Sequence, residues 1–160
     1  MIPRARFAHV NLVARDWRLL AEFYEQVFGC NRLPPERDYS GPDLEAGTGI
    51  EDARLRGIHL QLPGYEEGAG PTLEIFEYQP EGEAGPGSVN GIGYGHICFQ
   101  VADVEEARET VLQAGGSAVG DVVTLSPARQ ASVTWCYVRD PEGNIIELQR
   151  WRPFGFVPAG

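Results

Sequence analysis

The sequence predicts an α+β protein that is built from two copies of one βαβββ module. The first observation is a weak internal repeat, in which residues 9–16 align with residues 96–103 at a shift of 87 positions. The second is that, in each copy, a strand-like segment is followed by a helix-like segment and then by three more strand-like segments. A repeat of this kind indicates repeated structural units, and modules this small are expected to join or pack their sheets to complete a core.

The first strand and helix of each copy have clear sequence signals. A strand is expected over residues 7–13, because alternate positions in it are apolar. Asp16 is a suitable N-cap for the helix that follows, and Gly29 is a suitable end. In the second copy, Asp103 and the pair Gly115-Gly116 take the same places. The apolar face of the first strand consists of Ala8, Val10 and Leu12.

The remaining strands and loops follow from β-branched and apolar runs separated by Gly, Pro and acidic residues. Further strands are expected near 30–33, 55–62 and 72–78 in the first copy, and at 117–125, 131–138 and 144–150 in the second. Loops are expected at 34–35, 40–49 and 64–70, with a tight turn at 140–143. The whole chain, 1–160, is predicted to be a single domain, with module 1 at about 5–79, a linker at 80–92 and module 2 at about 93–152.

Composition excludes several classes of protein. Thirteen arginines and no lysine face 23 acidic residues, for a net charge of −10, which argues against a nucleic acid or an anionic membrane as partner. No apolar stretch approaches the roughly 20 residues that span a bilayer. The N-terminus shows no secretory apolar region. The cysteines, Cys30, Cys98 and Cys136, form no C-x-x-C pair, so we expect reduced thiols in a cytoplasmic protein.

Each copy carries one histidine and one glutamate on the strand face that points away from its helix. His9 and His96 lie on the first strands, and Glu74 and Glu147 lie in the middle of the last strands. A carboxylate between apolar neighbours in a strand is costly unless it has a partner. Two imidazoles and two carboxylates suit a divalent metal such as Ni, Co, Zn, Mn or Fe. The alternative is that these are ordinary hydrogen-bonded or solvated strand residues.

Other side chains on these faces are candidates to line a pocket for a small-molecule substrate. For His59 the alternative is an ordinary polar contact, and Cys98 is interpreted as a small wall residue, with a ligand or a nucleophile as the alternatives. The aromatic candidates are equally compatible with a place in the core. The full set of substrate-pocket candidates is Asn11, His59, Phe76, Tyr78, Cys98 and Gln149.

Several segments together resemble the vicinal oxygen chelate superfamily, which includes glyoxalase I, methylmalonyl-CoA epimerase, extradiol dioxygenases and bleomycin resistance proteins. The similarity extends over roughly residues 5–150, and the segments that carry it are 7–13, 23–29, 73–78, 95–99 and 140–148. The resemblance implies paired βαβββ modules whose sheets curve into a cup around one divalent metal. It also implies that the metal ligands are His9, Glu74, His96 and Glu147.

The resemblance further implies a metal-dependent isomerase or lyase that transfers a proton next to a carbonyl through an enediolate or enolate. Glu74 is similar to the residue at this place in glyoxalase I, whereas the dioxygenases leave the place open. Glu147 is the first choice for the base, with Glu74 as its partner. The alternatives are an extradiol-type dioxygenase and a non-catalytic protein that binds an antibiotic or other small molecule. Relatives by resemblance are frequently homodimers, with the metal site inside one chain or shared between chains.

Overall fold

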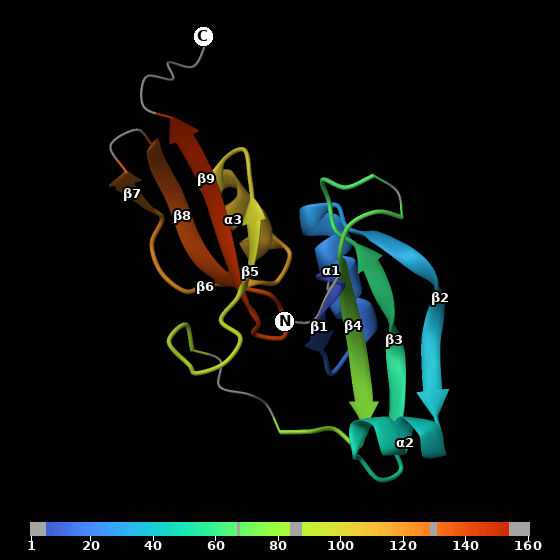
Figure 1. Ribbon diagram of the computed structural model, residues 1–160. Coiled ribbons are helices and arrows are strands. Elements are labelled where there is room, and N and C mark those ends of the chain that lie inside the picture. The colour runs from blue at the N-terminus through green and yellow to red at the C-terminus, as the bar shows by residue number, and fades with distance from the viewer. Residues whose placement is uncertain (1–5, 67, 84–87, 129–130, 154–160) are drawn as a thin grey trace. The chain divides into compact units, whose positions relative to one another are not determined.

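The computed structural model describes residues 6–66, 68–83, 88–128 and 131–153. The chain forms two compact units, Met1–Ala84 and Gly85–Gly160, which are shown in Figure 1. Each unit contains one sheet with a helix of ten or twelve residues on one side. The predicted α+β fold class is therefore confirmed, while the single-domain organisation and the shared cup stay predictions.

Unit 1 is a four-stranded sheet in the order β1-β4-β3-β2. The first strand pairs parallel with β4, and the other pairs are antiparallel. A parallel pair requires a crossover connection, so the chain must leave the end of the first strand and return through α1. The strands are β1 (His9–Val13), β2 (Asn31–Ser40), β3 (Arg54–Gln61) and β4 (Thr72–Gln79), and the crossover helix is α1 (Trp17–Phe28).

The ends of α1 lie where the sequence predicts them. The Asp16 carboxylate accepts hydrogen bonds from the backbone N–H groups of Arg18 and Leu19 at 3.0 and 3.1 Å, a cap that stabilises a helix by about 1 kcal/mol. Gly29 ends the helix in the left-handed region with φ of 69°, which glycine adopts without a steric penalty.

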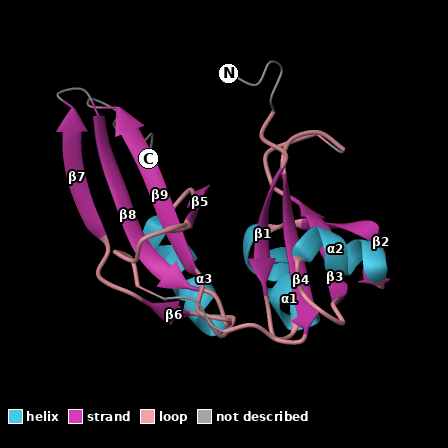
Figure 2. Ribbon diagram, turned by 60° about the horizontal axis from the view of Figure 1, so that its bottom comes forward, coloured by secondary structure: helices cyan, strands magenta, loops and turns pink. Residues whose placement is uncertain are grey.

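The core of unit 1 lies between α1 and one face of the sheet (Figure 2). Complete burial of a large apolar side chain contributes about 1.5–3 kcal/mol, so this layer supplies most of the stability of the unit. The largest fully buried side chains of this layer are Trp17, Leu20, Tyr24, Ile58, Leu60, Leu73 and Ile75.

Unit 2 repeats this topology, with the strand order β5-β9-β8-β6 and β7 also paired to β8. Its first and last strands again pair parallel. Asp103 caps the helix by accepting from the backbone N–H groups of Glu105 and Glu106. The elements are β5 (Ile97–Gln100), α3 (Val104–Gln113), β6 (Ser117–Ala118), β7 (Val123–Ala128), β8 (Ala131–Arg139) and β9 (Ile145–Pro153).

Three predicted boundaries are wrong. Pro34 and Pro35 lie inside β2 rather than in a loop; proline is tolerated there because β2 is an edge strand with a register shift between Leu33 and Arg37. The predicted loop at 40–49 contains the short helix α2 (Pro42–Thr48), which has a proline in its first turn. The predicted strand at 117–125 is split into β6 and β7.

The predicted turn at 140–143 is confirmed and fixes the start of β9. The Asp140 side chain is buried, and its Oδ1 accepts from the backbone N–H groups of Glu142 and Asn144. Its Oδ2 accepts from the Asn144 side-chain amide at 2.8 Å. These bonds satisfy the buried carboxylate, so the register of the last strand is set three residues before Glu147.

We predict that Gly57→Ala destabilises the protein by about 2 kcal/mol, the usual scale of overpacking. A Cβ at position 57 would clash with the backbone oxygen of Ile75 and the ring of Phe76. Gly47→Ala is the matched control, because its Cβ would meet nothing within 4 Å and alanine favours the helix that contains it. Urea unfolding of both variants measures the change, and a Gly57→Ala protein as stable as wild type would contradict the prediction.

Candidate functional site

In unit 1, strand pairing brings the predicted residues His9 and Glu74 together. The Nδ1 atom of His9 lies 3.3 Å from Oε1 of Glu74. The glutamate side chain is only 13% exposed, whereas the imidazole is 48% exposed. The flanking residues Leu73 and Ile75 are fully buried under α1, so alternation along β4 turns Glu74 to the opposite face of the sheet. The side of the sheet predicted for these two residues is therefore the observed one.

A third residue, His59, faces the same carboxylate from β3. His59 and Glu74 are direct partners in the antiparallel β3–β4 register, and Nε2 of His59 lies 3.4 Å from Oε1 of Glu74. Burial is the main cause that lowers the pKa of His59; Arg37 and His9 add to this effect and Glu74 opposes it. The imidazole is therefore neutral at pH 7. Strand parity alone placed His59 on this face but did not identify its partner.

Unit 2 repeats the arrangement with His96 and Glu147. The Nε2 atom of His96, which lies just before β5, is 2.9 Å from Oε2 of Glu147. Tyr137 is the register partner of Glu147 on β8, and its ring centroid is 5.2 Å from that of His96. Burial raises the pKa of Tyr137, and the charge of Glu147 adds to the effect. The phenol is therefore protonated at neutral pH.

The donor atoms of the pairs His9–Glu74 and His96–Glu147 are of the kind that bind divalent cations, but a single pair has too few donors for a complete site. Among the residues that the structure describes, no group of three or more His, Cys, Asp or Glu side chains is arranged to hold a metal ion. Each unit instead supplies one largely covered carboxylate, which has the imidazoles of His9 and His59 beside it in unit 1 and the imidazole of His96 in unit 2. Such N and O donors suit zinc, nickel, cobalt, manganese or iron, which take four or more ligands. A complete site would therefore need more donors than one pair.

The other predicted pocket residues divide between the units and differ in burial. Asn11 donates to the backbone oxygen of Glu74 at 3.4 Å, and Tyr78 is half-buried at the end of β4. Phe76 is buried and packs against His59, with 5.7 Å between ring centroids, so it contributes to packing.

In unit 2, Cys98 is exposed as a residue, but its thiol is partly desolvated. This desolvation raises the pKa of the thiol to about 11, and the charge of Glu147 adds to the effect. Gln149 accepts a hydrogen bond from the Trp151 indole at 2.9 Å. A substrate-lining role for these residues stays a prediction.

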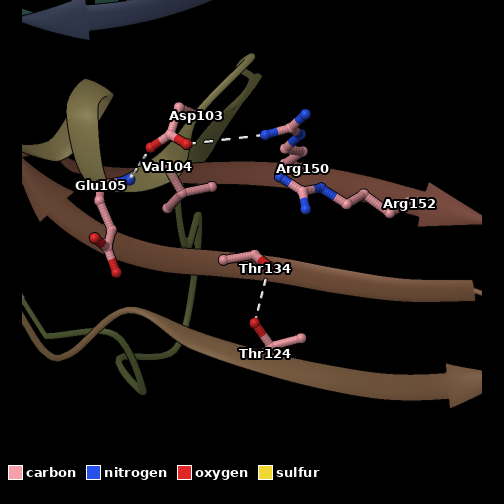
Figure 3. Close-up of a pocket in the computed structure, with 7 residues that line it drawn as sticks. All are labelled: Asp103, Val104, Glu105, Thr124, Thr134, Arg150 and Arg152. Atoms are coloured by element: carbon pink, nitrogen blue, oxygen red, sulfur yellow. Dashed lines mark hydrogen bonds and ion pairs between the residues drawn. The ribbon is translucent and has the colours of Figure 1, made fainter. Parts of the chain in front are cut away.

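A cavity of about 250 Å³ in unit 2 lies on the sheet face opposite to His96 and Glu147, beside the start of α3 (Figure 3). The Thr124 and Thr134 hydroxyls bond to each other at 2.8 Å, and Arg150 lies 3.8 Å from Asp103. Its charged residues carry both signs, and His96 and Glu147 do not line it. The lining residues are Asp103, Val104, Glu105, Thr124, Thr134, Arg150 and Arg152.

Within the described residues, no helix is long and apolar enough to cross a membrane. Comparison with known proteins gives a family match over most of the chain. Residues 6–148 match the model of the Glyoxalase/Bleomycin resistance protein/Dioxygenase superfamily.

A lactoylglutathione lyase from Arabidopsis thaliana is 27% identical over 148 residues; the match covers 89% of this chain but only 43% of that protein. An ethylmalonyl-CoA/methylmalonyl-CoA epimerase from Cereibacter sphaeroides is 23% identical, with 91% and 97% of the two chains covered. The crystal structure of a glyoxalase family protein from Bacillus cereus has a TM-score of 0.77 at 22% identity, with 94% and 98% of the two chains covered. This last likeness establishes the fold.

Proposed function

The chain belongs to the Glyoxalase/Bleomycin resistance protein/Dioxygenase superfamily, and on that premise we propose that it is a metal-dependent lyase or isomerase. The proposed reaction moves a proton on the carbon next to a carbonyl group of a small molecule. The observation that carries the proposal is the imidazole–carboxylate pair in each unit, at 3.3 Å for His9–Glu74 and 2.9 Å for His96–Glu147. Relatives named as a lyase and an epimerase support the same class of chemistry.

The proposed ligands of one divalent cation are His9, Glu74, His96 and Glu147. When bound, such a cation supplies Lewis acidity that stabilises negative charge on a carbonyl oxygen. The two imidazoles contribute neutral nitrogen donors, and the two carboxylates offset the charge of the cation. The parallel pairing of first and last strands holds each imidazole beside its carboxylate before any ligand binds, which reduces the ordering cost of binding.

Glu147 is the proposed base. Its carboxylate takes the proton from the carbon next to the carbonyl, and the electron pair of the broken C–H bond moves towards the carbonyl oxygen. In an isomerase Glu147 returns the proton to the neighbouring carbon, whereas in an epimerase a second carboxyl group delivers a proton to the opposite face of the same carbon. Glu74 supplies a second carboxylate related to Glu147 by the internal repeat, and an epimerase needs two such groups on opposite faces of its substrate.

We predict that purified protein binds a divalent metal and that His9→Ala and Glu147→Gln each reduce the metal content by at least about tenfold, because the first removes a donor and the second replaces an anionic donor with a neutral one. Glu109→Gln is the control, since this exposed carboxylate on α3 accepts from Gln113 and has no place in the proposed site. Elemental analysis after dialysis against Ni, Co, Zn, Mn or Fe measures the content. Full metal in both site variants would end the proposal.

We predict that the metal-loaded protein exchanges solvent deuterium into the carbon next to the carbonyl of lactoylglutathione or methylmalonyl-CoA. Glu147→Gln should slow the exchange at least about 100-fold, the scale of general base catalysis, whereas Glu109→Gln should not. NMR in D₂O follows the exchange. Oxygen consumption with catechols would instead identify a dioxygenase, and ligand-dependent thermal stabilisation without turnover would identify a binding protein.

A homodimer is also part of the proposal, with a second copy covering an apolar patch on the sheet face of unit 2 that also carries Glu147. Val123, Leu125 and Trp151 are 38%, 51% and 46% exposed, and their register partners place them on one face of the sheet. We predict that sedimentation equilibrium gives about twice the 17.6 kDa chain mass and that Leu125→Glu gives monomers. The control is Leu19→Glu, which changes an exposed leucine of α1. A wild-type monomer would contradict this prediction.

A further inference from the structure

One oxygen of Glu74 lies between two imidazoles. Its Oε1 is 3.3 Å from Nδ1 of His9 on β1 and 3.4 Å from Nε2 of His59 on β3. Because β4 pairs with both of these strands, the carboxylate is approached from its two sides by backbone-anchored side chains. His9 already has a place among the proposed ligands, whereas His59 has none.

The surroundings of His59 restrict its position. Its side chain is 26% exposed, and its ring meets Phe76 edge-on, with ring planes at 65°. Its backbone is paired on both sides, to Leu33 on β2 and to Glu74 on β4. A side chain held this way is suited to orienting a neighbour, because little conformational freedom is lost when the neighbour binds.

The corresponding place in unit 2 holds no imidazole. Tyr137 is the register partner of Glu147, as His59 is of Glu74, and the Tyr137 ring lies against His96 instead. Glu147 therefore has one imidazole beside it and Glu74 has two. This difference suits a Glu74 carboxylate whose orientation is held more firmly than that of Glu147.

We propose that His59 is a positioning residue that holds the Glu74 carboxylate in the orientation it uses towards a divalent cation. The inference rests on the proposed function. At 3.4 Å the contact is longer than the usual N–H···O hydrogen bond of about 2.9 Å, so the N–H dipole of the neutral His59 imidazole orients the Glu74 carboxylate and leaves its oxygen open to a cation. Loss of such an outer partner typically costs 10–100-fold in metal affinity.

Two substitutions of His59 separate orientation from packing. In His59→Gln the side-chain amide N–H reaches about as far as Nε2, whereas in His59→Asn it stops one bond short, and both residues stay polar. Co²⁺ affinity is measured by competition with a chromophoric chelator, together with the visible spectrum of bound Co²⁺ and the melting temperature of the metal-free protein. Leu33→Ala is the packing control, because Leu33 on β2 is the register partner of His59 and its side chain has no polar atom.

His59→Asn should weaken Co²⁺ binding at least about tenfold, and His59→Gln should stay within about threefold of wild type with the wild-type spectrum. Leu33→Ala should bind Co²⁺ normally. Equal affinities for the two His59 variants would overturn the inference, as would a His59→Asn loss as complete as that of Glu74→Gln, which would make His59 a ligand. Wild-type protein that takes up no Co²⁺ would overturn the proposed function and the inference with it.

Discussion

The parallel pairing of the first strand with the last strand in each unit is the constraint on which the other features depend. It sets β1 beside β4 and β5 beside β9, although these strands are separated by most of the length of their units. A parallel neighbour forces the chain to cross over through a helix, so the pairing also explains why α1 and α3 follow the first strands. Without it, each histidine would have no carboxylate within reach.

The helices then divide each sheet into two unlike faces. One face is apolar and fully covered, as Leu73, Ile75 and Ile146 show, while the alternate residues Glu74 and Glu147 on the same strands lie on the other face beside the histidines. Burial of the apolar residues provides free energy of folding that offsets the cost of covering the carboxylates on the other face. The polar face is thus a product of the same alternation that builds the core.

Much of this was predictable because it depends on local periodicity. The helix caps at Asp16 and Asp103 and the face occupied by Glu74 follow from patterns within a few residues, and the repeat follows from comparing two such patterns along the chain. What local patterns could not predict depends on neighbours distant in sequence. Prolines in β2 are tolerated because the strand lies at an edge, and the contact of His59 with Glu74 depends on the register of β3 against β4. Alternation along one strand predicts which face of the sheet a side chain occupies, whereas only the register of two strands identifies the residue that it contacts.

The unlike residues opposite the two carboxylates have a consequence for how such a duplicated fold diversifies. In each unit, one position on the neighbouring strand is the register partner of the glutamate. This position holds His59 opposite Glu74 in unit 1 and Tyr137 opposite Glu147 in unit 2. A substitution there changes the surroundings of one acid and leaves its counterpart untouched. Because of the duplication, the surroundings of each carboxylate can be changed separately by a single substitution at its register partner, His59 or Tyr137.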